Sequence, residues 1–193
     1  MLEIELLRTL HHKNIVKYLG SFKDDNNLNI FLEYVSGGSL ERIYKTYPMN
    51  ENLLRVYTRQ ILEGLEYLHV NNVIHRDIKA ANILLDSQGT CKLADFGSSK
   101  KIYGSISHNT FCGTPYWMAP EVIKQSGHDR YADIWSLGCT VYEMIAGRPP
   151  WSEKKDISVL LAIAEAQDPP RYPKNISPEL KSFLDCCFKR DPH

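Results

Sequence analysis

The stretch HRDIKAAN at residues 75–82, followed by DFG at residues 95–97, is the part of this chain that decides its fold. A third short motif, APE at residues 119–121, comes later in the chain. Five fixed residue types in the first stretch would occur by chance in a chain of this length in roughly one of ten thousand cases, at about 1/20 per position. We therefore interpret the three motifs as parts of one site.

The residue types in these motifs suit in-line phosphoryl transfer, which needs alignment and charge neutralisation more than covalent chemistry. Asp77 can accept the proton of an attacking hydroxyl group, and Lys79 can reach a γ-phosphate. Asn82 and Asp95 supply a neutral and an anionic oxygen, the hard ligands that Mg²⁺ prefers. A single aspartate is more often a turn or cap residue, but the order and spacing of the set favour catalysis.

The bulk composition excludes several other classes of protein. Of 193 residues, 43% are hydrophobic and 24% charged, which is enough to bury a sizeable core. Lys plus Arg equals Asp plus Glu at 23 each, so no net field attracts nucleic acid or an anionic membrane. No apolar run reaches the roughly 20 residues that span a bilayer. Five cysteines without paired spacing indicate reduced thiols and a cytoplasmic location, and no Cys/His cluster has zinc spacing.

Apolar periodicity predicts a small β portion followed by a larger helical portion. Residues 2–10 are predicted as a helix, and residues 15–22 and 28–35 as the strands of a hairpin. Ser36-Gly37-Gly38 is predicted to be a flexible joint. Beyond the joint, the pattern predicts helices at 52–70, 131–146, 156–166 and 177–189, short strands flanking a loop at 73–93, and a long polar loop at 97–113.

Through these motifs the chain resembles a eukaryotic protein kinase catalytic domain along its whole length. Lys79, together with Thr114 in a Gly-Thr-Pro sequence, resembles the serine/threonine kinases. The segments GTPYWMAPEVI at residues 113–123 and ADIWSLGCTVYEMIAGRPPW at residues 132–151 look most like the mitogen-activated protein kinase kinase kinases. Within the second segment, Gly-Cys-Thr at 138–140 favours that group over the germinal-centre kinases.

The resemblance implies an α+β, two-lobe protein kinase-like fold in a single domain. Residues 1–35 would form a partial N-lobe, with the family's helix C and strands 4 and 5, and residues 36–193 a largely complete helical C-lobe. No G-x-G-x-x-G spacing occurs among the glycines and no lysine precedes Glu3. The family's first three strands, with their phosphate-covering loop and lysine, are therefore expected to be missing.

The resemblance also assigns cofactors and their contacts, position by position. ATP and Mg²⁺ are the implied cofactors, with Asn82 and Asp95 as metal ligands. Leu32 falls at the gatekeeper position and Leu84 under the adenine ring, although a plain core leucine remains an equal alternative for Leu84. The implied nucleotide contacts are Leu32, Glu33, Val35, Ser39, Lys79, Asn82, Leu84 and Asp95.

Other implied roles are structural or regulatory. Asp133 matches the buried carboxylate that holds the amides of the catalytic loop, and Glu121 matches a glutamate of a buried ion pair. Glu3 matches the helix-C glutamate, with a solvated surface residue as the alternative. The implied apolar column between the lobes consists of Leu7, Tyr18, His75 and Phe96.

Phosphorylation is predicted to regulate the protein. Thr110 falls at the family's usual phosphosite and would be modified by an upstream kinase or by autophosphorylation. We hypothesise that phosphorylated Thr110 pairs with Arg76 and Lys100 and orders the 97–113 loop through charge-assisted hydrogen bonds. The alternative is a solvated loop threonine.

The leading functional hypothesis is an ATP-dependent protein serine/threonine kinase that acts on a downstream MAP kinase kinase. A catalytically dead interaction or decoy module is the alternative. A small-molecule kinase of the aminoglycoside type is disfavoured, because it predicts neither the APE nor the Gly-Thr-Pro segment. Residues 1–193 alone are expected to bind Mg²⁺–ATP weakly and to transfer no phosphate measurably. Whether Met1 is a true start is left open.

Overall fold

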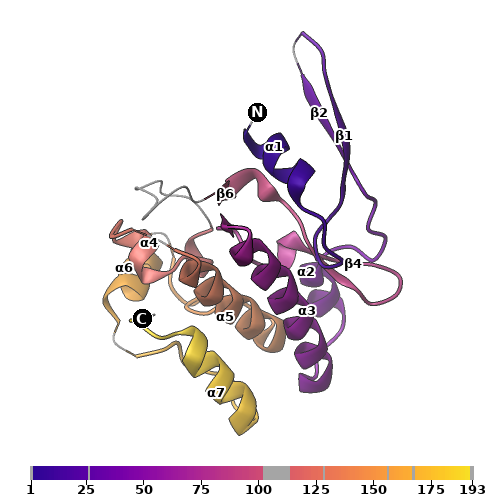
Figure 1. The fold of residues 1–193 in the computed structure, drawn as a ribbon. Helices are drawn as coiled ribbons and strands as arrows, with labels where there is room; N and C mark the ends of the chain where they lie inside the picture. The colour runs from indigo at the N-terminus through magenta and orange to yellow at the C-terminus, as the bar shows by residue number, and fades with distance from the viewer. Residues whose placement is uncertain are drawn as a thin grey trace.

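The structure is a computed structural model that describes the backbone of residues 2–25, 27–101, 114–127, 129–155, 157–166 and 168–191. Side chains are described for the same residues except 2–5 and 101. Within these residues the chain forms short antiparallel strand pairs and a helical body (Figure 1).

The N-terminal part consists of one helix and one hairpin. In α1 (Leu2–Thr9) the described leucines are buried, and β1 (Tyr18–Lys23) pairs antiparallel with β2 (Leu28–Leu32). The predicted strand 15–22 is wrong at its start. Ile15 and Val16 are buried beside β5 (Cys91–Leu93), and the Val16 N–H donates to the Leu93 carbonyl at 2.9 Å. Burial in the body therefore takes these apolar residues away from the hairpin.

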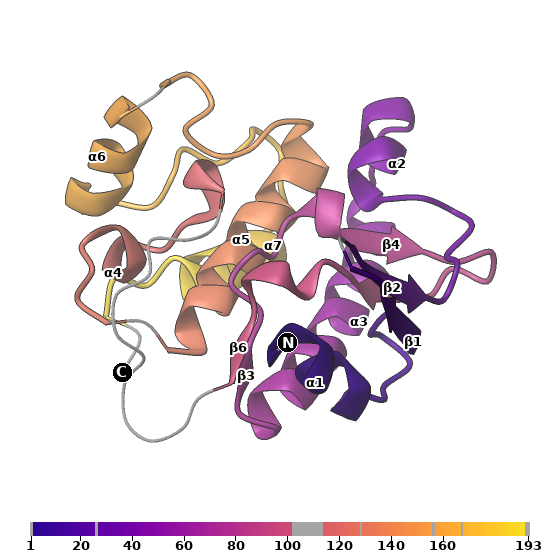
Figure 2. The ribbon, with the colours of Figure 1, turned by 90° about the horizontal axis from the view of Figure 1, so that it is seen from above.

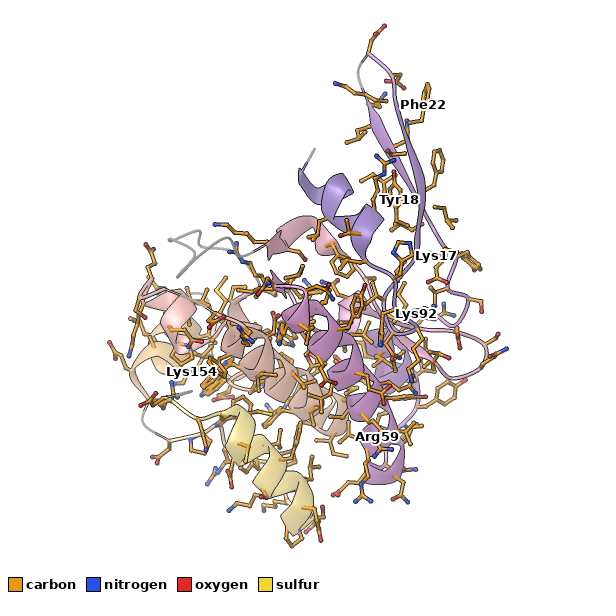
Figure 3. All side chains as sticks on the ribbon, in the orientation of Figure 1. Lys17, Tyr18, Phe22, Arg59, Lys92 and Lys154 are labelled. Atoms are coloured by element: carbon orange, nitrogen blue, oxygen red, sulfur yellow. The ribbon has the colours of Figure 1, made fainter. Side chains whose placement is uncertain are left out.

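The hairpin projects from the helical body (Figure 1) and exposes apolar side chains. Leu19 and Phe22 of β1 are each 60% exposed, and Phe31 of β2 is 54% exposed. Figure 3 shows Phe22 near the far end of the hairpin and Lys17 at its foot. A two-stranded sheet has no second layer of its own to bury such side chains, so they remain in water.

The predicted flexible joint at residues 36–38 is tied to β4 (Ile83–Leu85). The Gly37 N–H donates to the Leu85 carbonyl at 2.8 Å, and the Leu85 N–H donates to the Gly38 carbonyl at 2.9 Å. A Cβ atom on Gly37 would lie 2.3 Å from the Leu85 oxygen, so only glycine permits this approach. The predicted joint does lie at residues 36–38, but the prediction that it is flexible is wrong, because it is hydrogen-bonded to β4.

Two helices follow the joint. Ser39 caps α2 (Leu40–Thr46), and Asn50 caps α3 (Glu51–Val70) by accepting from the Leu53 N–H at 2.9 Å. The predicted helix 52–70 is confirmed. Its apolar positions at steps of three and four are all buried: Leu54, Tyr57, Ile61, Leu65 and Leu68.

Short strands and 3₁₀ turns then carry the HRDIKAAN and DFG motifs across one face of α3. In chain order they are β3 (Val73–Ile74), η1 (Ala80–Asn82), β4, β5, η2 (Phe96–Ser98) and β6 (Lys100–Lys101). β3 pairs antiparallel with β6, and β4 with β5. The predicted loop at 97–113 is therefore wrong over its first residues, which form a turn and a strand. Residues 102–113 lie outside the described part.

The C-terminal body is helical. It comprises η3 (Pro115–Trp117), α4 (Pro120–Ile123), α5 (Tyr131–Ala146), α6 (Ile157–Glu165) and α7 (Pro178–Cys187). Figure 2 shows α5 between α4 and α6 on one side and α2 and β4 on the other. α5 packs so closely on α7 that a Cβ atom on Gly138 would lie 2.6 Å from the Cys187 Cβ. In the described part of the chain, none of the helices has the length and apolar character needed to cross a membrane.

Candidate active site

Three side chains meet at the start of the HRDIKAAN stretch. Lys79 Nζ donates to Asp77 Oδ2 and to Thr114 Oγ1, each at 2.7 Å. The Thr114 hydroxyl in turn donates to Asp77 Oδ1 at 2.9 Å. Thr114 precedes η3, so the tertiary fold brings it to residues that lie far away in the sequence. Both oxygens of the Asp77 carboxylate are thus held in a defined orientation.

Asn82 connects this cluster to the segment that carries Asp95. Asn82 Nδ2 donates to the carbonyl of Asp77 at 2.9 Å and to its Oδ2 at 2.8 Å, while the Asn82 carbonyl accepts from the Ala94 N–H at 2.9 Å. Asp95 follows directly, with a left-handed φ of 63°. Among the described residues, no hydrogen bond or ion pair involves Asn82 Oδ1 or the Asp95 carboxylate. These two oxygen donors lie on adjacent backbone segments.

The surroundings of Asp77 keep its carboxyl ionised. Burial alone would raise its pKa, but the hydrogen bonds from Lys79 and Thr114 and the Lys79 charge outweigh burial and lower the pKa. A carboxylate with a lowered pKa is a weak base and a good hydrogen-bond acceptor. The geometry therefore suits Asp77 to orient a hydroxyl group more than to remove its proton early.

Asp133 anchors the residues before Asp77. It lies fully buried in the first turn of α5 and accepts from the His75 N–H at 2.9 Å and the Arg76 N–H at 2.8 Å. His69 Nε2 lies 2.8 Å from Asp133 Oδ2. Burial would raise the pKa of Asp133, but the His69 contact and the His75 amide bring it below its usual value. Arg76 needs this support, because its φ of 71° is unfavourable for a side chain of its size.

His75 is a neutral spacer between the two motifs. Its ring is buried against Phe96, with centroids 4.9 Å apart, and burial lowers its pKa. The Asp77 N–H donates to His75 Nδ1 at 3.3 Å, which leaves Nε2–H to donate to the Ala94 carbonyl at 3.1 Å. Of the other members of the implied apolar column, Leu7 is buried and Tyr18 is partly buried.

The predicted adenine-binding segment follows β2. Among the described residues, no backbone hydrogen bond involves the Glu33 carbonyl or the Val35 N–H. The Glu33 carboxylate accepts from the Lys17 N–H at 2.8 Å and pairs with Lys92 Nζ at 2.9 Å. Figure 3 shows Lys17 and Lys92 near each other at the foot of the hairpin. Leu32, the predicted gatekeeper, ends β2 with 41% of its surface exposed.

Ser39 and Leu84 pair in an antiparallel bridge between the start of α2 and β4. The Ser39 hydroxyl accepts from the Arg42 N–H at 3.3 Å as the cap of α2, and Leu84 is half-buried. Their predicted contacts with a nucleotide stay predictions.

The predicted regulatory residues are only partly described. The Glu3 side chain and Thr110 lie outside the described residues, so the proposed Thr110 pairing cannot be placed. Lys100 lies in β6, where its backbone pairs with Ile74. Glu121 is partly buried on α4, and burial raises its pKa while the charge of Arg190 acts in the opposite direction.

A family model described as "Protein kinase domain" matches residues 1–193. The chain belongs to the protein kinase domain family. It is 51% identical over 193 residues to "Mitogen-activated protein kinase kinase kinase A" of Dictyostelium discoideum, covering 98% of this chain and 20% of that protein.

Two plant kinases are similarly related. Identity is 48% over 195 residues to "Mitogen-activated protein kinase kinase kinase 3" of Arabidopsis thaliana, covering 98% of this chain and 30% of that protein. It is 50% over 195 residues to "MAP3K epsilon protein kinase 1" of Brassica napus, covering 99% of this chain and 15% of that protein. The chain spans under a third of each of these relatives. The predicted protein kinase fold and the serine/threonine kinase family are confirmed.

The donor set of this kinase domain fits the divalent metal and ATP that the family uses. Among the described residues, no group of three or more His, Cys, Asp or Glu side chains could hold a metal ion by itself. Mg²⁺, however, is usually held by one or two protein oxygens together with phosphate oxygens and water. Asn82 Oδ1 and the Asp95 carboxylate, both without a described hydrogen bond, provide such a pair.

Two polar residues of α5 in this kinase domain contact the HRDIKAAN stretch and were not predicted. Thr140 Oγ1 lies 3.4 Å from the Ile78 carbonyl, and Glu143 Oε1 accepts from the Ala80 N–H at 2.8 Å. A signal was available, because Asp133, Ser136, Thr140 and Glu143 form a polar stripe on one face of a largely apolar helix. A buried polar face on a helix predicts backbone partners nearby.

Proposed function

We propose that the polypeptide containing this chain transfers the γ-phosphate of ATP to a serine or threonine hydroxyl of a protein. The substrate would be a downstream kinase, namely a MAP kinase kinase, because the similar proteins carry the name of the kinases one level above it. The observation that carries the proposal is the cluster of Asp77, Lys79 and Thr114, with Asn82 bonded to the same carboxylate.

Each residue would have a distinct role. Asp77 would accept a hydrogen bond from the substrate hydroxyl and align it for attack. Lys79, held 2.7 Å from Asp77, would place a positive charge where negative charge develops. Thr114 would fix both side chains before the substrate arrives. Asn82 and Asp95 would hold Mg²⁺, which supplies charge neutralisation for the nucleotide when it is bound.

The nucleotide would lie between the hairpin and β4. The Glu33 carbonyl and the Val35 N–H would be available to hydrogen-bond adenine, and Leu84 on β4 would contact the ring. Leu32 and Ser39 would border the same site. Competition between nucleotides tests this part: ATP should displace a fluorescent ADP analogue, and Leu84→Arg should abolish binding of the analogue.

The direct test is transfer of labelled phosphate from ATP to an inactive MAP kinase kinase by the polypeptide that contains this chain. We expect Asp77→Asn to abolish transfer, while Asp185→Asn, an exposed control on α7, should leave it unchanged. Equal transfer by the wild-type and Asp77→Asn proteins would contradict the proposal. Absence of transfer, with retained binding to the substrate kinase, would favour the interaction or decoy module.

A further inference from the structure

α5 contacts the catalytic loop at several successive positions. Asp133 accepts from the amides of residues 75 and 76, Thr140 lies beside the carbonyl of Ile78, and Glu143 accepts from the amide of Ala80. These partners flank Asp77 and Lys79 on both sides. The backbone of the loop is therefore held by one helix along its length, and Glu143 makes the contact at the far end.

The Glu143 contact lies entirely in the protein interior. Glu143 is 1% exposed and Ala80 is fully buried, and the N–H···O distance between them is 2.8 Å. Ala80 is the first residue of η1, between Lys79 and Asn82. A shift of the Ala80 amide would therefore move the side chains of Lys79 and Asn82, which lie on either side of it in the chain.

The carboxyl of Glu143 has few hydrogen-bond partners for a buried acid. Burial raises its pKa to about 8, with a further contribution from the charge of Glu41. The Ala80 hydrogen bond, the Trp117 indole and the charge of Lys45 act in the opposite direction. Tyr44 of α2 and Cys139 of α5 also face it, and burial raises the pKa of both. In the described structure, neither Glu143 Oε2 nor Trp117 Nε1 has a hydrogen-bond partner of normal geometry.

A buried carboxyl with so few partners is costly for the fold. An apolar residue would fill the same space on this largely apolar helix at no such cost. The one strong bond that Glu143 makes goes to the backbone between Lys79 and Asn82. The position of that bond suggests its role.

We propose that Glu143 is a positioning residue for phosphoryl transfer, which fixes Lys79 and Asn82 through its hydrogen bond to the Ala80 N–H. The consequence for catalysis rests on the proposed kinase function, but the effect on the backbone does not. Displacement of a catalytic group by about 1 Å can reduce a rate by about 10²-fold, so one hydrogen bond at this point is sufficient to matter.

The effect on the backbone can be measured in the chain itself by NMR. We expect the Ala80 amide to be protected from hydrogen exchange, and its proton shift to titrate with Glu143 near pH 8. In Glu143→Gln, which keeps an acceptor oxygen, protection should remain and the titration should disappear. In Glu143→Leu, protection of Ala80 should be lost.

Val141→Ala is the matched control for loss of stability. Val141 is as buried as Glu143 on the same helix, but it lines a cavity of about 260 Å³ between α3 and α7, away from the loop. This variant should melt at a lower temperature and still protect the Ala80 amide relative to its neighbours. Equal protection of Ala80 in the wild-type and Glu143→Leu proteins would overturn the proposal, as would equal loss in Val141→Ala.

Kinetics in an Ala80→Pro background separate positioning from a general structural role. Proline lacks the N–H and is tolerated at the first position of a helical turn. Lys79 already has the extended backbone (φ −160°, ψ 159°) that a residue before proline prefers. The proline ring would restrict this backbone covalently, so Glu143 should no longer be needed.

We expect Glu143→Leu to lower kcat by about 10²-fold with little change in the KM for ATP, and Glu143→Gln to retain most of the rate. In the Ala80→Pro background, the loss caused by Glu143→Leu should shrink by at least about tenfold. An equal loss in both backgrounds would overturn the proposal. If the wild-type polypeptide that contains this chain transfers no phosphate, the proposed function fails, and the NMR result still decides whether Glu143 orders the loop.

Discussion

Replacing Gly37 by alanine should destabilise the protein by about 2–4 kcal/mol. The new Cβ atom would lie 2.3 Å from the Leu85 carbonyl oxygen, well inside the 3.0 Å limit that real Cβ contacts respect. Because the opposing atom belongs to the backbone, no side-chain rotation can relieve the overlap. The 36–38 segment and β4 must separate, which breaks the 2.8 Å bond from Gly37 and the 2.9 Å bond to Gly38. Each broken bond costs about 0.5–1.5 kcal/mol net, and lost packing adds to it.

Gly89→Ala provides the matched control, because the space for a Cβ atom and the backbone conformation at Gly89 are the reverse of those at Gly37. Gly89 has a φ of 82° with nothing within 4 Å of its Cβ position, so alanine there has space but a strained backbone. That strain costs about 1–2 kcal/mol. Gly37 has no positive φ, so alanine there has an acceptable backbone but no space. Urea denaturation of both variants measures the difference. A Gly37→Ala variant as stable as the wild type, or more stable than Gly89→Ala, would refute the steric argument.

Three further predictions concern single side chains. Thr58→Val should stabilise the protein by about 1 kcal/mol, because the buried Thr58 hydroxyl has no hydrogen-bond partner among the described residues; a lower unfolding free energy in urea would contradict this. Thr114→Val should raise the pKa of Asp77, because it removes one of the bonds that lower it, and should slow transfer about tenfold; an unshifted acid limb of the pH–rate profile would argue against it. Glu143 has a pKa raised from 4.5 to about 8, so its contribution to stability is complete below pH 4.5 and is lost as the pH rises to about 8. Over that window, Glu143→Gln should remove a fall of about 1.4 kcal/mol per pH unit, and equal pH slopes in thermal melts of both proteins would exclude this.

Helices were the most predictable part of the fold. The 3.6-residue spacing of apolar side chains predicted α3 and α5 to within a residue or so, since each helix buries one continuous stripe. Strand boundaries were less predictable. Ile15 and Val16 have the composition of a strand, but their backbone pairs beside Leu93 and not in the hairpin. Composition alone does not determine which segment a strand pairs with.

Residues of the candidate site were predictable where they form a local motif. Asp77, Lys79, Asn82 and Asp95 could be selected from order and spacing, and their roles as catalytic groups stay predictions. Glu143 could be selected only as a polar position on an α5 stripe, because its partner is a backbone amide 63 positions away. Every residue except proline carries such an amide, so the partner has no signature in the sequence.

The sequence by itself determined the chemical groups of the site and the helical character of the body, because both depend on residue type and short-range spacing. Only the tertiary structure decided that Thr114 joins Lys79 and Asp77, that Gly37 must lack a side chain beside Leu85, and that α5 binds the backbone of residues 75–80 through Asp133 and Glu143. These contacts join segments distant in the chain, and they depend on which groups the packing of the whole fold brings within reach.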